Sequence, residues 1–372
     1  MRTCGLERPT SPGASGEPSR RTQHVPRPPV SAPAEFNVAV VGASGLVGEA
    51  MVQILEERSF PVARLHALAA ERSLGESVTF RGRSVSLEPL AEFDFSAAHL
   101  ALFSAGAAAS REYVPRAVAA GCIVIDNTGE FRYRDDVPLV VPEVNAHAIA
   151  DFREQGIIAN PNCTTVQVVV ALKPLYDAAG IERVQVATYQ SVSGAGREAV
   201  EELAQQSIQL LSGRAPVTPR VIARQIAFNC VPQIDEFQEN GYTLEEMKML
   251  WETRKILGDS ALRVNATAVR VPVFYGHSAA VQLETQRKLT AAEARALLTK
   301  APGVTVLDEA RPGGYPTAAT EAANRDTVYV GRIREDLSSD RGLNLWVVAD
   351  NVRKGAATNS VQIAEILVRQ HM

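Results

Sequence analysis

The stretch NVAVVGASGLVG, from Asn37 to Gly48, decides the fold of this 372-residue chain. Its first five residues form a short apolar run, and apolar side chains recur at helical spacing over residues 46–58. Glycines between a strand and a helix permit a tight turn and let the backbone approach a pyrophosphate, whose charge the helix N-terminus favours. The stretch therefore predicts the start of a dinucleotide-binding domain; the alternative is a tight turn that binds no ligand. We expect the loop to contact a cofactor through Gly42, Ala43, Ser44, Gly45, Leu46, Val47 and Gly48.

Strands and helices alternate through the rest of the first half of the chain. Residues 78–87 predict a hairpin that turns at Arg81 and Gly82. Further strands are predicted at 64–70, 100–105 and 122–126, with a helix near 108–120. Such alternation favours a parallel sheet with helices on both faces.

The second half has a different pattern. A long apolar helix is expected to start at Cys163, and a final helix at Lys354–Arg369. Between them lie long strand-like runs at 183–193, 261–274, 278–286, 327–336 and 342–350. Long strands with few helices between them predict an α+β domain with a mixed or antiparallel sheet. The fold class is therefore α/β, a Rossmann-like domain plus an α+β domain, which agrees with a length of two domains.

Residues 1–35 differ from the rest of the chain. They contain seven of the 21 prolines and almost no apolar periodicity, so they cannot bury enough surface to offset the entropy of ordering. We expect a disordered tail. No apolar segment follows the twin arginine Arg20-Arg21, which argues against a secretory signal.

Composition narrows the classes of function. The net charge is −4 and no basic stripe occurs, so we expect no nucleic-acid partner. No apolar run approaches the roughly 18 residues of a membrane-spanning helix. The cysteines are far apart and lack a CxxC pair, so we expect neither a metal site nor disulfides, and a reducing cytoplasm. They are Cys4, Cys122, Cys163 and Cys230.

The end of the second predicted strand bears on the choice of cofactor. Enzymes that use NAD usually place an acidic residue here, on the ribose 2′-hydroxyl. This chain has Arg72 and Ser73, which can bind the 2′-phosphate of NADP. Glu71 keeps NAD as the alternative. We expect an extended segment, in which the side chain of Glu71 points away from that of Arg72.

Two short stretches carry candidate chemistry. In GIIANPNCTT (156–165), Cys163 begins a helix, whose N-terminus is expected to lower the thiol pKa and favour a nucleophilic thiolate. A small residue at a helix start is the structural alternative, and the other three cysteines are expected to be inert. In RVPVFYGHS, His277 is a candidate general base and Arg270 a candidate clamp for a carboxylate.

Together these motifs resemble those of the bacterial aspartate-semialdehyde dehydrogenases. GASGLVG, NPNCTT and RVPVFYGHS occur in the same order as in that family, with QSVSGAG from Gln190, LEEMK from Leu244 and NVRKGAA from Asn351. The resemblance runs from about Asn37 to the C-terminus. NPNC together with RVPV and GH is specific, whereas the glycine loop is shared with many families.

The resemblance implies a role for each matching residue. Cys163 is the nucleophile, His277 the acid/base and Gln190 the residue that orients the reacting group. Arg270 and Glu245 hold the carboxylate and ammonium of the substrate. The phosphate pocket uses Arg132, Lys248 and Asn162. Further cofactor contacts fall on Ser104, Gly106, Ser193, Gly194 and Asn351.

The family also implies an activity and an architecture. The reaction is the reversible, NADPH-dependent conversion of L-aspartyl 4-phosphate to aspartate 4-semialdehyde, which leads to lysine, threonine and methionine. No metal is needed. Residues 36–161 and 351–372 are expected to form the dinucleotide-binding domain, and residues 162–350 the catalytic and dimerisation domain of a homodimer.

The chain departs from the family at two places. Where the family commonly has Ser-Ser-x-Phe-Arg, this chain has Thr128-Gly129-Glu130-Phe131-Arg132, which removes a hydroxyl and adds an acid beside the phosphate pocket. After residues 100–105 the chain reads Gly106-Ala107-Ala108-Ala109-Ser110, where a second glycine is common. Both departures concern affinity rather than reaction type.

Two alternatives stay open at this point. The first is another acyl-phosphate reductase, such as one for N-acetyl-glutamyl phosphate, which usually has glycine directly before its cysteine. This chain has Asn162 there, and Glu245 suits a free ammonium. The second is a non-catalytic dinucleotide-binding sensor, against which the joint presence of Cys163, Gln190, Arg270 and His277 argues.

Overall fold

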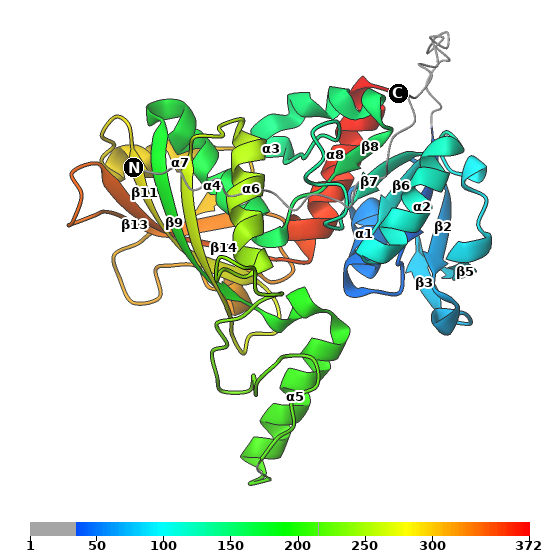
Figure 1. Cartoon of the computed structure of the whole chain (residues 1–372), viewed down its shortest axis with the longest axis horizontal. Helices are drawn as coiled ribbons and strands as arrows, with labels where there is room; N and C mark the ends of the chain where they lie inside the picture. Colours follow the sequence, from blue (N-terminus) through cyan, green and yellow to red (C-terminus); the bar gives the residue numbers. More distant parts are fainter. Residues whose placement is uncertain (1–34, 215) are drawn as a thin grey trace.

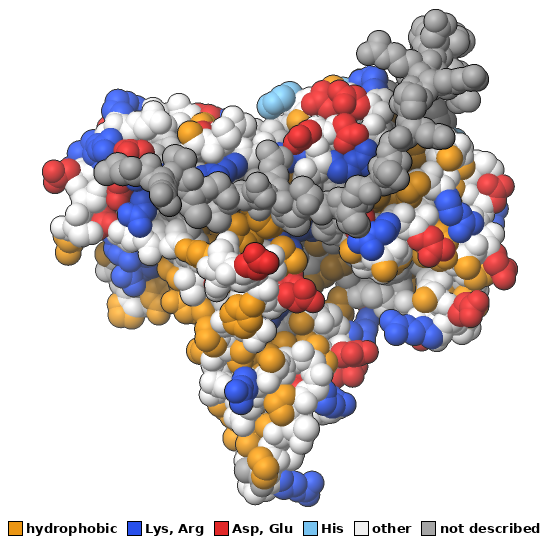
Figure 2. Space-filling view, in the orientation of Figure 1, with side chains coloured by type: hydrophobic (Ala, Val, Ile, Leu, Met, Phe, Trp, Pro, Cys, Tyr) orange, Lys and Arg blue, Asp and Glu red, His pale blue; other side chains and the backbone are white. Residues whose placement is uncertain are grey.

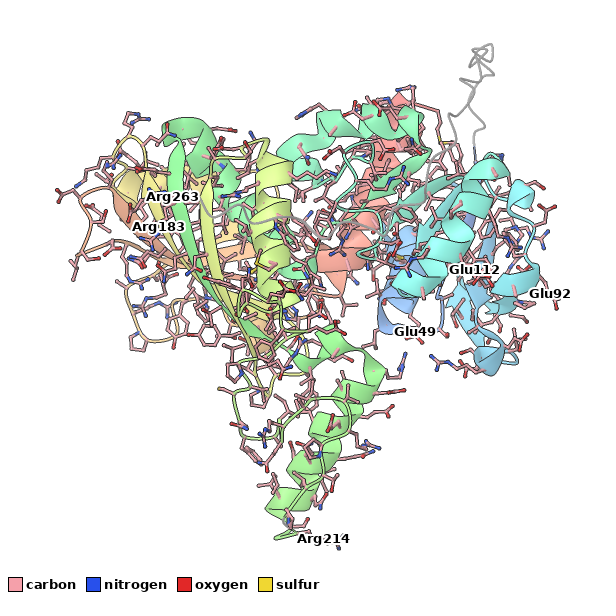
Figure 3. All side chains as sticks on the ribbon, viewed as in Figure 1. Glu49, Glu92, Glu112, Arg183, Arg214 and Arg263 are labelled. Carbon is pink, nitrogen blue, oxygen red and sulfur yellow. The ribbon has the colours of Figure 1, made fainter. Side chains whose placement is uncertain are left out.

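The computed structural model describes residues 35–214 and 216–372, which form two sheet-based halves side by side. Helix α5 (Arg197–Leu211) projects from them as an arm, with Arg214 at its tip (Figures 1 and 3). The tail predicted for residues 1–35 lies, except for Glu35, outside the described residues. In the described part of the chain, no helix is long and apolar enough to cross a membrane.

The first half contains a six-stranded sheet in the order β5-β2-β1-β6-β7-β8, with every pair parallel. The strand order reverses at β1, so the crevice beyond the ends of β1 and β6 is where such a sheet binds its ligand. The strands are β1 (Phe36–Val41), β2 (Val62–Ala69), β5 (Glu88–Pro89), β6 (Leu100–Phe103), β7 (Ile123–Asp126) and β8 (Ile157–Ala159). The sheet confirms the Rossmann-like prediction.

Helices cover this sheet, and a hairpin extends from it. The hairpin strands are β3 (Ser77–Phe80) and β4 (Arg83–Ser86). They turn, as predicted, at Arg81 and Gly82, which have φ of 49° and 70°. The helices are α1 (Leu46–Glu57), α2 (Ala107–Ala119), the short α3 (Pro142–Asn145) and the C-terminal α8 (Thr358–Gln370).

The predicted start of the last helix was wrong. A π-helical turn occupies Arg353–Ala357, and α8 follows it from Thr358. The wider turn is contiguous with α8 and is buried, so apolar spacing alone could not separate the two.

The second half contains a mixed sheet in the order β10-β9-β11-β14-β13-β12, with parallel pairs at both edges and antiparallel pairs between. This confirms the mixed sheet that long alternating strands predicted. Arg183 and Arg263, labelled in Figure 3, face each other across the parallel pair β9–β10. The strands are β9 (Ile181–Gln190), β10 (Arg263–Arg270), β11 (His277–Thr285), β12 (Val304–Val306), β13 (Val328–Glu335) and β14 (Gly342–Ala349).

Helix α4 (Cys163–Ala179) joins the two halves, and α6 (Leu244–Leu257) and α7 (Ala291–Lys300) pack near it. One cluster of buried apolar side chains runs from the first sheet through α4 into the second sheet. Close-packed interiors resist displacement, so α4 holds its first residue, Cys163, at a fixed place between the halves. An ion pair of 2.8 Å between Arg197 of α5 and Glu49 of α1 adds an exposed link, and Glu49 is labelled in Figure 3.

Candidate active site

A cavity of about 420 Å³ lies between the two halves. It collects residues that are distant in sequence, including most of those that the sequence analysis singled out. These are Arg132, Asn162, Cys163, Gln190, Glu245, Lys248 and Arg270, with Val47, Gly194 and Asn351 from the predicted cofactor set. His277 is not among the lining residues. Its Nε2 lies directly behind Gly194, where an added Cβ would be 3.2 Å from it.

The local sequence explains how Cys163 is held. Asn162 is the N-cap of α4, and its Oδ1 accepts hydrogen bonds from the backbone N–H groups of Thr164 and Thr165 at 3.0 and 3.2 Å. The π-helical turn presses on the other side, because a Cβ added to Gly355 would lie 2.8 Å from Cβ of Cys163. Cys163 is therefore fixed by a helix cap and by a glycine contact.

The expectation that the helix N-terminus lowers the pKa of Cys163 was wrong. Burial raises the pKa of the thiol to about 11, and the negative charge of Glu245 acts in the same direction. The bond with Thr164 and the charges of Arg270 and Arg132 oppose this rise without cancelling it. The resting group is a thiol at neutral pH, and the charges of Arg270 and Arg132 favour its thiolate form.

Glu245 anchors a buried polar network in the cavity. Its Oε1 accepts hydrogen bonds from Asn162 Nδ2 at 2.9 Å and Gln190 Nε2 at 3.1 Å, while Oε2 lies 3.3 Å from Lys248 Nζ. Burial acts to raise the pKa of Glu245, but Lys248 and these hydrogen bonds outweigh it and lower the pKa to about 2. Glu245 is therefore an anion that can bind an ammonium group.

Arg270 lies on the opposite wall, and His277 lies behind Gly194 next to it. Arg270 donates from Nη1 to the carbonyl of Ser191 at 2.8 Å. His277 Nδ1 accepts the backbone N–H of Ser191 at 3.0 Å, and this leaves the proton of the neutral ring on Nε2. Burial lowers the pKa of His277 to about 3, and the charge of Arg270 adds to this. Nε2 has no hydrogen-bond partner among the described residues, so its proton is available.

Cationic groups gather on the third side of the cavity. Arg132 is 6% exposed and donates from Nη2 to the carbonyl of Asn127 at 2.8 Å. Lys248 lies 2.6 Å from Asp235, a cavity residue with φ of 69°. The buried Arg132 and the half-buried Lys248 suit an acyl phosphate, whose leaving group is an anion.

The departure at Glu130 has a structural explanation. Its carboxylate forms a two-pronged ion pair with Arg111 of α2, with both contacts at 2.8 Å, and it does not line the cavity. Gly129 does line the cavity, and a Cβ there would meet nothing within 4 Å. The added acid is therefore neutralised outside the pocket, whereas the missing hydroxyl leaves open space inside it.

The glycine loop fits a nucleotide. Gly42 has φ of 86°, and a Cβ there would lie 2.6 Å from the carbonyl of Ser104. A Cβ on Gly48 would lie 2.1 Å from the carbonyl of Gly42, so α1 can approach the strand only with glycine at this position. α1 has no side-chain cap, which leaves its first N–H groups for an anion. Gly106 has φ of 90° and open space around it.

The segment predicted to bind the adenosine ribose of the cofactor differs in one respect from the prediction. Ser44 of the glycine loop lies 3.3 Å from Ser73, so the structure brings these two predicted cofactor residues together. However, Glu71–Ser73 is a 3₁₀ turn rather than an extended segment. Successive side chains in such a turn diverge by about a third of a revolution, so Glu71 and Arg72 do not point in opposite directions. Both side chains are exposed.

Ser193 and Asn351, which were predicted as cofactor contacts, are joined by a hydrogen bond. Asn351 Oδ1 accepts from Ser193 Oγ at 3.2 Å, from Ser191 Oγ at 3.1 Å and from the backbone N–H of Gly276 at 3.0 Å. These hydrogen bonds join three segments that surround His277. Asn351 also lines the cavity, and the contact of both residues with the cofactor stays a prediction.

The prediction that the cysteines other than Cys163 are inert can be compared with the exposure of two of them. Cys122 is 2% exposed, and burial raises its pKa to about 12, which agrees with an inert thiol. Cys230 is exposed, and its expected inertness stays a prediction. The segment turns at Phe228, which has φ of 59°, and exposes residues 228–230, whereas Ile226, Ala227 and Val231 on either side are buried.

Sequence reasoning missed Glu252, Asp235 and Gly355. Glu252 is fully buried on α6, at helical spacing after Glu245 and Lys248, and this i, i+3, i+7 pattern of charge was a signal that could have identified it. For the other two, we find no signal in the sequence outside the family motifs.

Comparison with known proteins gives the same assignment. Residues 37–152 match the family model "Semialdehyde dehydrogenase, NAD binding domain", and residues 172–354 match "Semialdehyde dehydrogenase, dimerisation domain". An aspartate-semialdehyde dehydrogenase of Legionella pneumophila is 61% identical over 337 residues, which cover 91% of this chain and 97% of that protein. The aspartate-semialdehyde dehydrogenase 2 of Vibrio cholerae is 55% identical, over 91% and 99% of the two chains.

Solved structures agree in three dimensions. The crystal structure of aspartate semialdehyde dehydrogenase II from Vibrio cholerae superposes with a TM-score of 0.89 at 55% identity, over 91% of this chain and 100% of that one. The same Vibrio protein has been solved complexed with ASA. Motifs, cavity and relatives coincide: the chain belongs to the aspartate-semialdehyde dehydrogenase family.

Proposed function

We propose that this protein catalyses the reversible, NADPH-dependent reduction of L-aspartyl 4-phosphate to L-aspartate 4-semialdehyde and phosphate, through a thioester on Cys163. One observation carries the proposal. A single cavity holds the thiol of Cys163, the anion Glu245 and the cations Arg270, Arg132 and Lys248. An amino acid with an acyl phosphate presents an ammonium, a carboxylate, an acyl carbon and a phosphate to such a set.

In the first half-reaction, the sulfur of Cys163 attacks the acyl carbon, and the proton of the thiol passes to the departing phosphate. The C–O bond to phosphate breaks, and the phosphate leaves toward Arg132 and Lys248. Glu245 binds the ammonium and Arg270 the carboxylate, which fixes the acyl carbon over the thiol. Gln190, held to Glu245 at 3.1 Å, orients the acyl group.

When bound, the cofactor supplies a hydride to the thioester carbon. The carbonyl oxygen then gains negative charge and takes the Nε2 proton of His277. As the C–S bond breaks, the proton returns to Nε2, the aldehyde forms and Cys163 leaves as a thiolate. Access to Nε2 passes Gly194, where any side chain would intervene.

We propose NADP as the cofactor because Arg72 and Ser73 offer donors to a 2′-phosphate beside Ser44. The solved structure of the Candida albicans enzyme with NADP, at 24% identity and a TM-score of 0.69, supports only the fold. Residues 36–161 with 351–372 would form the cofactor domain and 162–350 the catalytic domain, close to the limits of the two family models.

We further propose a homodimer formed by the catalytic domain. The match to a dimerisation domain supports it, as do the hydrophobic side chains gathered on the lower part of this half and along the arm (Figure 2). Exposed examples are Tyr189, Ile208, Leu211, Phe228 and Phe237. Light scattering of the pure protein should give twice the chain mass, and a monomer at working concentration would contradict this. The free thiols of the described residues suit a cytoplasmic location.

The test is a spectroscopic assay in the oxidative direction with aspartate semialdehyde, phosphate and NADP. We expect sustained, multiple-turnover formation of NADPH only when phosphate is present, with a larger kcat/KM for NADP than for NAD. N-acetyl-glutamate semialdehyde is the matched alternative substrate, and preference for it would assign the cavity to the other reductase class. No phosphate-dependent reduction of either cofactor would refute the proposal.

A further inference from the structure

A fully buried carboxylate, Glu252, lies on the inner face of α6 behind the cavity. Glu245, Lys248 and Glu252 follow at i, i+3 and i+7, so they lie along one face of this helix, and the first two reach the cavity directly. Glu252 does not line it. A buried charge without a contact to substrate is costly unless it is paired and hydrogen-bonded, so its partners indicate why it is there.

The two carboxylate oxygens of Glu252 accept hydrogen bonds from different donors. Oε1 accepts from Arg132 Nη1 at 3.1 Å and from the hydroxyl of Tyr133 at 3.2 Å. Oε2 accepts the backbone N–H of Asn162 at 2.6 Å. The bonds to Arg132 and Asn162 are the two that bear on the reaction. Arg132 faces the leaving phosphate of the proposed reaction, and Asn162 immediately precedes Cys163.

The carboxylate of Glu252 therefore links the guanidinium of Arg132 to the backbone N–H group directly before Cys163. The residues it joins are 120 and 90 positions away in the sequence. The bond to the carbonyl of Asn127 restrains Arg132 Nη2, while its Nε is buried and has no partner in the described part of the chain. With Nη1 and Nη2 restrained, the guanidinium has one orientation relative to Cys163.

We propose that Glu252 is a positioning residue, which holds Arg132 at the place where phosphate attacks the thioester of Cys163. This rests on the proposed function. A carboxylate is required because both of its oxygens accept hydrogen bonds. The isosteric amide of Glu252→Gln would turn an N–H group toward one of these donors and lose that bond.

The experiment measures steady-state kinetics in the oxidative direction for Glu252→Gln, with phosphate as the varied substrate. We expect kcat/KM for phosphate to fall about ten- to a hundredfold, the worth of one charge-assisted hydrogen bond. The KM values for aspartate semialdehyde and for NADP should stay within about threefold. Tyr133→Phe is the matched control, because it removes the third donor and leaves the bonds to Arg132 and Asn162; its phosphate kcat/KM should change less than about threefold.

A double-mutant cycle separates positioning from a general structural role. If Glu252 acts through Arg132, the pair Arg132→Ala with Glu252→Gln should have nearly the phosphate kcat/KM of Arg132→Ala alone. Independent losses that multiply would overturn the proposal. Glu252→Asp keeps the buried charge but shortens its reach, so it should fold even if the glutamine variant does not, and should show a partial loss for phosphate only.

The outcomes distinguish this inference from the proposed function. If the wild-type protein shows no phosphate-dependent turnover, the proposed function fails. If the wild type depends on phosphate and both Glu252 variants keep its kcat/KM, or lose all substrates equally, the positioning role alone is refuted.

Discussion

The substrate side and the cofactor side of the active site hold their charges in different ways. On the substrate side, Glu245 is 4% exposed and takes hydrogen bonds from Asn162 and Gln190. On the cofactor side, Arg72 is exposed in a short 3₁₀ turn, and the nearest tie is the 3.3 Å contact of Ser73 with Ser44.

This difference indicates which side of the active site controls turnover and which side controls the affinity for the cofactor. Buried, interlocked charges do not need to reorganise during reaction, and low polarity around them strengthens their effect on a transition state. Exposed charges are screened and act mainly on affinity. Changes on the substrate side should therefore reduce turnover, whereas changes at the adenosine end should alter the choice of cofactor.

The largest effect is expected from Cys163→Ser, which should abolish turnover because a serine hydroxyl is a far weaker nucleophile without a strong base beside it. NADPH binding, followed by fluorescence titration, should remain within about threefold of the wild type. Cys230→Ser is the matched control, since that thiol is exposed away from the cavity, and should keep full activity. Substantial turnover by the Cys163 variant would mean that another group is the nucleophile.

His277→Asn should lower kcat by roughly 10²–10⁴-fold, the usual contribution of a positioned acid/base. The KM for aspartate semialdehyde should hardly change, because His277 lies behind Gly194 rather than in the cavity wall. His147→Asn, at an exposed site, serves as the control. A higher KM with an unchanged kcat would make His277 a binding residue and blur the distinction between the two sides.

The pH dependence of Cys163 reactivity should show which influence controls the thiol. With a pKa near 11, the thiolate fraction of the free protein rises about tenfold per pH unit. Iodoacetamide labelling of the Cys163 peptide, in the Cys230→Ser background, should therefore accelerate about a hundredfold from pH 7 to 9. A plateau below pH 8 would show that the helix N-terminus outweighs burial.

The smallest effect is expected from Arg72→Ala, which should reduce the preference for NADP over NAD by about tenfold. A charged hydrogen bond is worth roughly ten- to a hundredfold, and exposure places Arg72 at the low end of this range. The measurement is kcat/KM for each cofactor, with Glu71→Gln as the neighbouring comparison. An unchanged preference in Arg72→Ala would transfer the selection of cofactor to Glu71 or Ser73.

Local features of this arrangement could be predicted from the sequence, whereas long-range features could not. The glycine loop, the hairpin turn and the start of α4 at Cys163 follow from neighbouring residues, and all three were confirmed. The gathering of Arg270 and Glu245 around Cys163 was expected only through the family resemblance. Spacing along the chain cannot show that helices and strands so far apart in the sequence meet at one cavity.

The features that escaped prediction depend on tertiary packing. The pKa of Cys163 reverses its expected direction because burial, which no local motif reports, outweighs the helix N-terminus. Gly355 matters only through its contact with Cys163, and Glu252 through partners about a hundred residues away. The 3₁₀ turn at Glu71 is a local miss, since no glycine or proline marks it.

The central claim is that Cys163 carries the acyl group between the two half-reactions, and a single-turnover experiment tests it most directly. The protein is mixed with aspartate semialdehyde and NADP in the absence of phosphate, NADPH absorbance is followed, and the quenched protein is digested for mass spectrometry. We predict a burst of about one NADPH per active site, with the aspartyl group attached to the Cys163 peptide and discharged when phosphate is added. A burst with the adduct on another residue, or steady turnover without phosphate and without any adduct, would contradict the account.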